Sequence, residues 1–113
     1  MRNVLITVAL CCCAFSCTVN NSLYDWSNYN YVMYDYIKNP SEKSAENLKS
    51  TYLKIMKNKG SRKTPPPGVC ADLGYILIKE GLVEEGQKYL EKEIELYPES
   101  ELFISKVLNR ISQ

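Results

Sequence analysis

Glu91 and Glu95 are the residues whose types and spacing come closest to catalytic chemistry. Two carboxylates four residues apart share one face of a helix, and a general acid–base pair needs such groups in a cleft. The sequence contains no histidine, the commonest general base and metal ligand. It also contains no nucleophile motif and no phosphate-binding loop. We therefore expect the two glutamates to lie on an exposed helix face, in a protein that is not an enzyme and has no catalytic residue, metal site or cofactor.

The cysteines offer a different chemistry, which begins in the first residues. Arg2 precedes the uncharged run VLITVALCCCAF, which is too short to span a bilayer and lacks the polar positions of an amphipathic helix. Residues 1–16 are therefore predicted to be a signal peptide rather than a buried helix of a cytosolic domain. The run ends in AFSC, which resembles the bacterial lipobox, where a small residue precedes a cysteine that is acylated. Cys17 is then the lipidation site and the first residue of the mature chain.

Lipidation implies a location. Acyl chains such as palmitate anchor a protein almost permanently, because each buried methylene contributes about 0.8 kcal/mol. Residues 17–22 form a short lipidated tether. Thr18 takes the place at which an aspartate favours the inner membrane in enteric-type bacteria, so the resemblance implies the outer membrane, facing the periplasm. Cys70 is the cysteine left without a lipid in the mature chain, so no intramolecular disulfide can form, and we expect its thiol to be buried and unreactive.

Charge is divided between two parts of the chain. Residues 38–63 carry eight basic and two acidic side chains, whereas residues 72–101 carry nine acidic and three basic ones. This separation of charge has two interpretations: a dipole that steers association, or two solvated helix faces of opposite sign. The basic cluster at residues 54–63 is too short to indicate nucleic-acid binding, although it suits anionic lipid head groups.

Apolar periodicity predicts an all-α fold. Residues 24–36 place aromatic side chains at helical spacing, with Ser22 or Asp25 as the N-cap, although an alternating pattern leaves a strand open. Asn39 is expected to cap a second helix, which ends at Gly60.

A proline-rich loop at residues 58–68 follows this helix. The sequence PPPG cannot lie inside a helix, because each ring removes an N–H group and clashes with the preceding turn. We interpret it as a stiff polyproline II spacer. The alternative is a ligand for a proline-reading domain, which would need a P-x-x-P register.

Residues 67–100 resemble one tetratricopeptide repeat, a pair of antiparallel helices of about 34 residues. The residues that match the helix-packing positions of such a repeat are Leu73, Gly74, Leu77, Gly86, Leu90 and Pro98. The resemblance implies that Gly74 and Gly86 allow the two helices to approach closely. Cys70 and Glu93 depart from the repeat, in the places of a usual tryptophan and a usual alanine.

The first half of the chain can be interpreted as a degenerate repeat of the same kind. Residues 98–101 then open a last helix, with Phe103, Val107 and Ile111 on one stripe. The expected fold is tetratricopeptide-repeat-like, with about two antiparallel helical hairpins and a C-terminal capping helix in a single domain over residues 23–113.

The chain also resembles a family of small bacterial lipoproteins that is catalogued as a domain of unknown function. The segments LYDW, PPPGVCADLGYILIKEG and EKEIELYPES carry this resemblance. Members are usually encoded beside two other lipoproteins, one of them similar to the curli secretion-channel protein, which implies a shared envelope assembly.

Two functions are consistent with these features. The first is a non-enzymatic scaffold or adaptor that binds other envelope lipoproteins or membrane proteins. The second is glycan or peptidoglycan binding through the aromatic segment 24–36. The aromatic residues expected to contact a partner are Trp26, Tyr29, Tyr31, Tyr75 and Tyr89, and core packing is the alternative role for each of them.

Overall fold

The structure, a computed structural model, describes Met1, residues 22–58 and residues 60–113, and it is all-helical over them. Its elements are α2 (Tyr29–Lys38), α3 (Glu42–Lys57), α4 (Val69–Lys79), α5 (Val83–Leu96), the 3₁₀ turn η1 (Pro98–Ser100) and α6 (Glu101–Ile111). The prediction of an all-α fold is confirmed. The expected signal peptide and Cys17 lie outside the described residues, apart from Met1. None of the described helices is long and apolar enough to cross a membrane.

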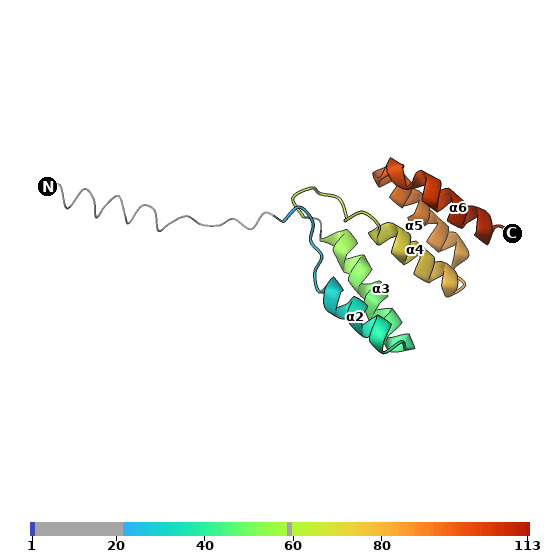
Figure 1. Ribbon diagram of the computed structural model, residues 1–113, viewed down its shortest axis with the longest axis horizontal. Helices are drawn as coiled ribbons and strands as arrows, with labels where there is room; N and C mark the ends of the chain where they lie inside the picture. Colours follow the sequence, from blue (N-terminus) through green and yellow to red (C-terminus); the bar gives the residue numbers. More distant parts are fainter. Residues whose placement is uncertain (2–21, 59) are drawn as a thin grey trace.

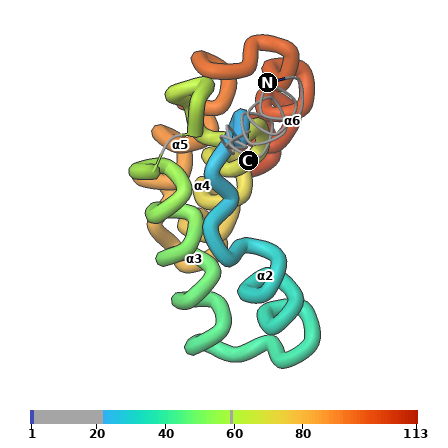
Figure 2. The backbone as a smooth tube through the Cα atoms, turned by 90° about the vertical axis from the view of Figure 1, so that its left-hand side faces the viewer, coloured from blue at the N-terminus to red at the C-terminus, as the bar shows by residue number. Residues whose placement is uncertain are grey.

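The helices pack in the order in which they follow one another along the chain (Figures 1 and 2). α2 lies along α3, α4 lies along α5, α3 contacts α4, and α6 contacts α5. The main core is formed by buried side chains of α2, α3 and α4: Val32, Leu48, Tyr52, Ile55, Val69, Leu73 and Leu77. Its α3 members are three or four residues apart, which is the spacing of one helix face. Leu90 of α5 and Ile104 of α6 are buried as well.

α2 begins later than the sequence predicts. Ser22 and Asp25, the expected caps, lie in an irregular segment, and the helix begins at Tyr29. The carbonyl oxygens of Ser22 and Leu23 accept hydrogen bonds from the backbone N–H groups of residues 61–62 (both 3.2 Å). Carbonyls that are paired with another segment do not close helical turns. The predicted caps are therefore wrong, whereas the choice of a helix over a strand is confirmed for residues 29–38.

α3 is capped by Ser41 rather than by Asn39. The Ser41 hydroxyl accepts a hydrogen bond from the Ser44 N–H (3.1 Å), and the Ser44 hydroxyl accepts one from the Ser41 N–H (2.9 Å). This reciprocal pair is a capping box. Asn39 instead ends α2, where its N–H donates to the carbonyl of Asp35 (2.8 Å). The predicted cap is wrong because the helix begins at Glu42, after Ser41, whose hydroxyl and N–H are both paired with Ser44.

The N-terminus of α4 is capped by a side chain from another helix. Its N-cap residue is Gly68, which has no side chain and takes a left-handed conformation (φ 91°). Glu93 of α5 supplies the missing acceptor, because its two carboxylate oxygens receive the N–H groups of Gly68 (2.7 Å) and Ala71 (3.3 Å). Glu93 is only 2% exposed. The hydrogen bonds and the partial positive charge of the helix N-terminus offset the cost of burying its carboxylate.

α4 and α5 meet at two buried glycines. A Cβ atom on Gly74 would lie 2.7 Å from the carbonyl oxygen of Gly86, and one on Gly86 would lie 2.5 Å from that of Gly74. The helix separation seen here therefore requires residues without a side chain at both positions. Leu73, Leu77 and Leu90, from the same two helices, are also buried.

Cys70 is fully buried in α4, in agreement with the expectation from the sequence. Burial, and to a lesser degree the charge of Glu93, raises the pKa of its thiol to about 11. A thiol that is both protonated and inaccessible is a poor nucleophile.

α6 buries the predicted stripe only in part, because Val107 and Ile111 are half-buried but Phe103 is not. Ile104 is buried, whereas Phe103 is 67% exposed. Ile104 lies three residues before Val107 and shares its helix face, so it takes the place in the stripe that was predicted for Phe103. Pro98, which was expected to pack between helices, is exposed at the first position of η1.

Candidate partner-binding groove

A groove lies between α2 and α4, with α3 as its floor. The α2–α4 groove has a volume of about 160 Å³ and is lined by Met33, Tyr36, Leu48, Tyr52, Asp72, Tyr75, Ile76 and Lys79. Leu48 and Tyr52 are each 1% exposed and form the floor, whereas Tyr75 is 53% exposed and stands at the rim. The groove is therefore an opening over the main core, with apolar and aromatic walls.

Helical spacing explains why these side chains line one groove. Met33 and Tyr36 are three residues apart on α2, so they share a helix face. Asp72, Ile76 and Lys79 are four and three residues apart on α4 and share a face in the same way. Packing of α3 against both α2 and α4 then places the two faces around one hollow.

A polar contact crosses the floor of the groove. The Tyr52 hydroxyl donates a hydrogen bond to Asp72 Oδ2 (3.1 Å). Burial, followed by the charge of Asp72, raises the pKa of Tyr52 far above its ordinary value, so the hydroxyl remains a donor. Asp72 keeps part of its side chain in solvent. Its partial burial raises the pKa of its carboxyl group, and the hydrogen bond from Tyr52 opposes this shift.

Charged residues border the groove on the α4 side. The Lys79 ammonium lies 5.7 Å from the centroid of the Tyr75 ring. Beyond it, Lys49 of α3 pairs with Glu80 at the end of α4 (2.8 Å) and with Glu46 (2.9 Å). Glu80 first, and then Glu46, raises the pKa of Lys49. Partly exposed ion pairs of this kind contribute at most about 1 kcal/mol, so Lys49 links α3 to α4 without adding much stability.

The structure separates the five aromatic residues that the sequence predicts as partner contacts. Tyr75 lines the groove. Tyr29 and Tyr89 are half-buried and pack against the main core. Trp26 and Tyr31 are exposed (42% and 75%) and do not line the groove. The five residues therefore do not form one surface.

Met33, Tyr36 and Ile76 line the groove although the sequence analysis did not assign them to partner binding. A signal for two of them was present, because Met33 and Tyr36 lie three residues apart in the segment 24–36 that was predicted to be helical. Helical spacing alone does not distinguish the wall of a groove from the interior of a core.

Glu91 and Glu95 are exposed on α5, and neither lines the α2–α4 groove. No group of three or more His, Cys, Asp or Glu residues in the described parts of the chain could hold a metal ion.

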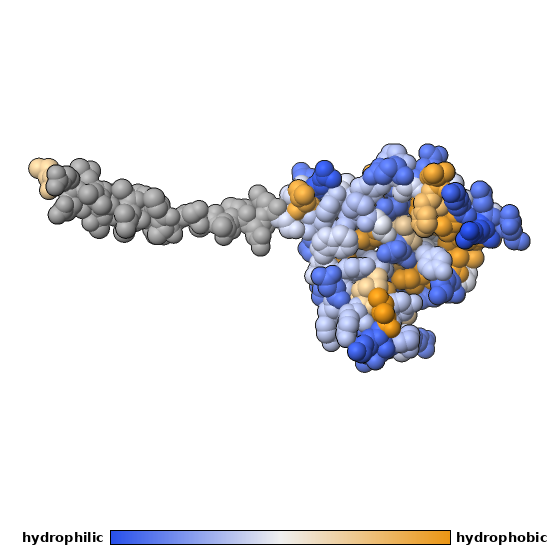
Figure 3. Space-filling model, in the orientation of Figure 1, coloured by the Kyte–Doolittle hydropathy of each residue, from blue (hydrophilic) through white to orange (hydrophobic). Residues whose placement is uncertain are grey.

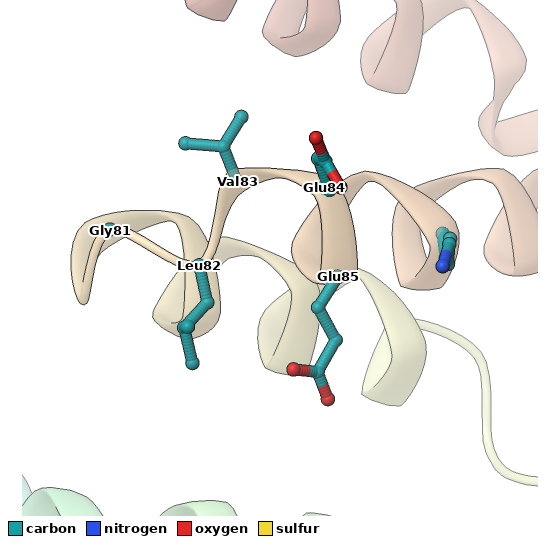
Figure 4. A pocket seen from close by; sticks show the side chains of 6 residues that line it. Gly81, Leu82, Val83, Glu84 and Glu85 are labelled. Carbon is teal, nitrogen blue, oxygen red and sulfur yellow. The ribbon is translucent and has the colours of Figure 1, made fainter.

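Another hollow lies at the turn between α4 and α5 (Figure 4). It is lined by Gly81, Leu82, Val83, Glu84, Glu85 and Lys88. Val83 and Glu84 point to one side of the turn, whereas Leu82 and Glu85 point to the other. Because these side chains do not converge, we do not regard this hollow as a binding site.

Over the described residues, the structure thus defines the class of protein as an all-helical domain with an apolar groove over its core. Residues 23–107 match the DUF4810 family, a domain of unknown function, and the chain belongs to this family. No curated protein matches the sequence, and no solved structure matches it.

Proposed function

We propose that the protein is a lipid-anchored, non-enzymatic adaptor of the bacterial envelope, which binds a segment of another envelope protein in the α2–α4 groove. In this proposal residues 1–16 are removed as a signal peptide, and Cys17 is acylated and held in the outer membrane. The helical domain then faces the periplasm. The groove, lined by three helices, is the observation that carries the proposal.

The packing of the helices supports a tetratricopeptide-repeat-like arrangement. α2 with α3 and α4 with α5 form the two hairpins, and α6 is the capping helix. Stacked helix pairs create concave surfaces that bind other proteins. α2 and α4 are the first helices of the two pairs, and both contribute to the groove. The close contact of Gly74 with Gly86 supports the second hairpin.

The chemistry of the groove defines the segment that it accepts. A cavity of roughly 150 Å³ holds a ring of the size of benzene, so the groove of about 160 Å³ accepts one large apolar side chain. Met33, Tyr36 and Ile76 provide apolar contacts for this side chain. Asp72 and Lys79 stand beside them and can bind polar backbone or side-chain groups of the same segment.

Crosslinking in intact cells tests this function. Cells that express the tagged full-length chain are treated with a crosslinker, and the complexes are purified and analysed by mass spectrometry. We expect the wild-type protein to recover one or two envelope lipoproteins or membrane proteins, and Tyr75→Ala to lose most of them. Tyr31→Ala removes an equally large but more exposed tyrosine outside the groove and should retain them.

Two results would count against the adaptor. Equal recovery of the same partners by Tyr75→Ala and the wild-type protein would mean that the groove is not the binding surface. Recovery of only abundant porins by all variants would mean that no specific partner exists. A parallel Cys17→Ser variant tests the anchor, because its partners should be lost if binding depends on membrane attachment.

Glycan binding through residues 24–36 is a second candidate function. It is favoured by Tyr31 and Tyr34, which are 75% and 61% exposed on α2, although the Lys38 ammonium lies over the Tyr34 ring, 5.7 Å from its centroid. Trp26 is the single tryptophan of the chain and lies in the same segment, so its fluorescence reports on this surface. Titration with muropeptides should change the Trp26 emission if the segment binds glycans, and an unchanged emission at saturation would exclude this function.

A further inference from the structure

The beginning of the described domain is fixed to the proline-rich loop. The N–H and the hydroxyl of Ser61 both donate to the Ser22 carbonyl (3.2 and 3.0 Å), and the Arg62 N–H donates to the Leu23 carbonyl (3.2 Å). A Cβ atom on Gly60 would lie 2.6 Å from that same Leu23 oxygen, so glycine permits this approach. The point at which the chain enters the domain is therefore defined.

Side chains strengthen the same attachment. Arg62 Nη1 donates to the Tyr24 hydroxyl (2.9 Å), and the guanidinium lies 5.8 Å from the centroid of the Tyr24 ring. At the other side of the loop, the Tyr97 hydroxyl donates to the Pro65 carbonyl (2.6 Å). The loop is thus bound both to the start of the domain and to the end of α5. Figure 1 shows the start of the coloured chain and the loop at the same end of the molecule.

This end of the domain, formed by residues 22–27, 57–58 and 60–63, is called the proximal face. Figure 2 is drawn from its side and shows the first coloured residues crossing in front of the helices. Leu23 and Trp26 are 60% and 42% exposed. In Figure 3, apolar and hydrophilic atoms lie side by side where the coloured chain begins.

The charge of the proximal face is basic. Its described residues include three basic ones, Lys57, Arg62 and Lys63, and one acidic residue, Asp25. Asp25 Oδ1 accepts a hydrogen bond from the Ser27 N–H (2.8 Å), so the carboxylate closes its own turn. Lys57 and Lys63 are exposed. Exposed apolar and aromatic residues beside basic ones are the composition that binds an anionic lipid surface.

We propose that the proximal face lies on the head groups of an anionic phospholipid bilayer, with Leu23 and Trp26 at the interface and the basic side chains against lipid phosphates. The inference rests on the proposed acylation of Cys17. Cys17 precedes Ser22 by five residues, which span at most about 18 Å when fully extended. The tether therefore keeps this face close to the bilayer, where basic residues are attracted within a Debye length of roughly 10 Å.

The contact fixes the orientation of the domain. None of the residues that line the α2–α4 groove belongs to the proximal face. A domain that lies on the bilayer through this face keeps the groove accessible to proteins in the periplasm. Membrane contact and partner binding thus use different surfaces and can occur together.

The fluorescence of Trp26 provides the test. The full chain is expressed with its signal peptide, purified and inserted into vesicles of phosphatidylcholine and phosphatidylglycerol whose acyl chains are brominated. Because Trp26 is the single tryptophan, we expect its emission to be quenched relative to vesicles without bromine. Vesicles of brominated phosphatidylcholine alone, which carry no anionic lipid, should give much weaker quenching. Unquenched Trp26 in both kinds of vesicle would overturn the proposal.

Charge-reversal variants identify the face. Lys57→Glu/Lys63→Glu is chosen because Arg62 holds Tyr24 and must remain. We expect the ratio of docked to undocked protein, measured by quenching, to fall about twentyfold or more, since each basic residue near an anionic surface contributes roughly fivefold. Lys106→Glu/Arg110→Glu makes the same charge change on α6 and should leave quenching unchanged. An equal loss in both double variants would mean that only net charge matters and would overturn the proposal.

Matched apolar variants complete the test. Leu23→Ser should reduce quenching, whereas Leu102→Ser, at a residue of similar exposure on α6, should not. The mass of the purified protein separates the two proposals. If it shows no acyl chain, the proposed anchor fails. The proximal face is then tested with residues 17–113 carrying Cys17→Ser, held on nickel-chelating lipid by an N-terminal hexahistidine.

Discussion

Glu93 Oε1 lies 2.7 Å from the backbone nitrogen of Gly68, so a residue of α5 caps the helix that precedes it. The contact joins the proline-rich loop, α4 and α5 at one point. Glycine at the N-cap permits the left-handed backbone there, and the carboxylate replaces the cap that glycine lacks. Neither residue performs this role alone.

We expect Glu93→Gln to lower the free energy of unfolding by about 1–3 kcal/mol. The amide keeps one acceptor oxygen but brings an NH₂ group toward the N–H groups of Gly68 and Ala71, and it removes the charge that favours a helix N-terminus. Urea denaturation followed by circular dichroism measures the change. Glu95→Gln, at an exposed position of the same helix, should stay within about 0.5 kcal/mol of the wild-type value. Equal effects of the two substitutions would show that the cap is not important.

Gly74→Ala should also destabilise the protein, although alanine is the better helix former. Alanine gains about 1 kcal/mol of helix propensity. Its methyl group would meet the carbonyl oxygen of Gly86, a backbone atom that no rotamer change can remove, and overpacking of this kind costs about 1–3 kcal/mol. We therefore expect a net loss in thermal and urea denaturation. Ser50→Ala, at an exposed site on α3, provides the control without a clash, and a Gly74→Ala protein as stable as Ser50→Ala would contradict the prediction.

Local signals in the sequence predict the parts of the fold that depend on one helix. The stripe of Leu48, Tyr52 and Ile55 follows from helical periodicity, and glycines inside two amphipathic helices indicate a close approach, because they are costly otherwise. The first residue of α2 could not be predicted in this way. Its start is determined by hydrogen bonds between residues 22–23 and residues 61–62, about forty positions later in the chain.

The residues of the α2–α4 groove could be predicted from the sequence only in part. Tyr75 was singled out as an aromatic residue, but its neighbour Ile76 was not, because an apolar residue at helical spacing is as consistent with a core as with a groove. Whether such a residue lines a groove or lies in a core depends on the distance between α2 and α4, and helical periodicity does not define this distance. Glu93 is the opposite case. In the sequence it departs from the repeat pattern, which does not indicate a role in packing. In the structure its buried carboxylate accepts the N–H of Gly68, a residue that lies far away in sequence.

Cys70 should make the stability of the protein depend on pH in the alkaline range. The pKa of its thiol is about 11 in the folded state and 9.0 ordinarily, so the folded state holds the proton more tightly. The resulting stabilisation is fully present below pH 9 and is lost as the pH rises toward 11. We expect the free energy of unfolding to fall more steeply between pH 9 and 11 in the wild-type protein than in Cys70→Ala. Parallel slopes would contradict this.

The same burial predicts slow thiol chemistry. At pH 8 a disulfide reagent such as dithionitrobenzoate should leave Cys70 unmodified in the folded protein and modify it rapidly in concentrated urea. Rapid modification without urea would mean that α4 opens easily from α5.

Tyr52→Phe should destabilise the protein more at neutral pH than in acid. The hydroxyl of Tyr52 donates to Asp72, and this bond lowers the pKa of Asp72, while burial raises it above the ordinary value of 3.8. With the donor removed, the pKa of Asp72 rises further, so the folded state favours the protonated carboxyl more strongly. Stability that depends on that proton is present below pH 3.8 and is lost as the pH rises through the folded pKa. The free energy of unfolding of Tyr52→Phe should therefore be lower than that of the wild-type protein by about 1 kcal/mol at pH 7 and by clearly less at pH 3.

Urea denaturation at both pH values measures the difference, and Tyr31→Phe, which removes a hydroxyl from an exposed ring, should show none. If Tyr52→Phe loses the same free energy of unfolding at both pH values, this hydrogen bond does not stabilise the ionised form of Asp72.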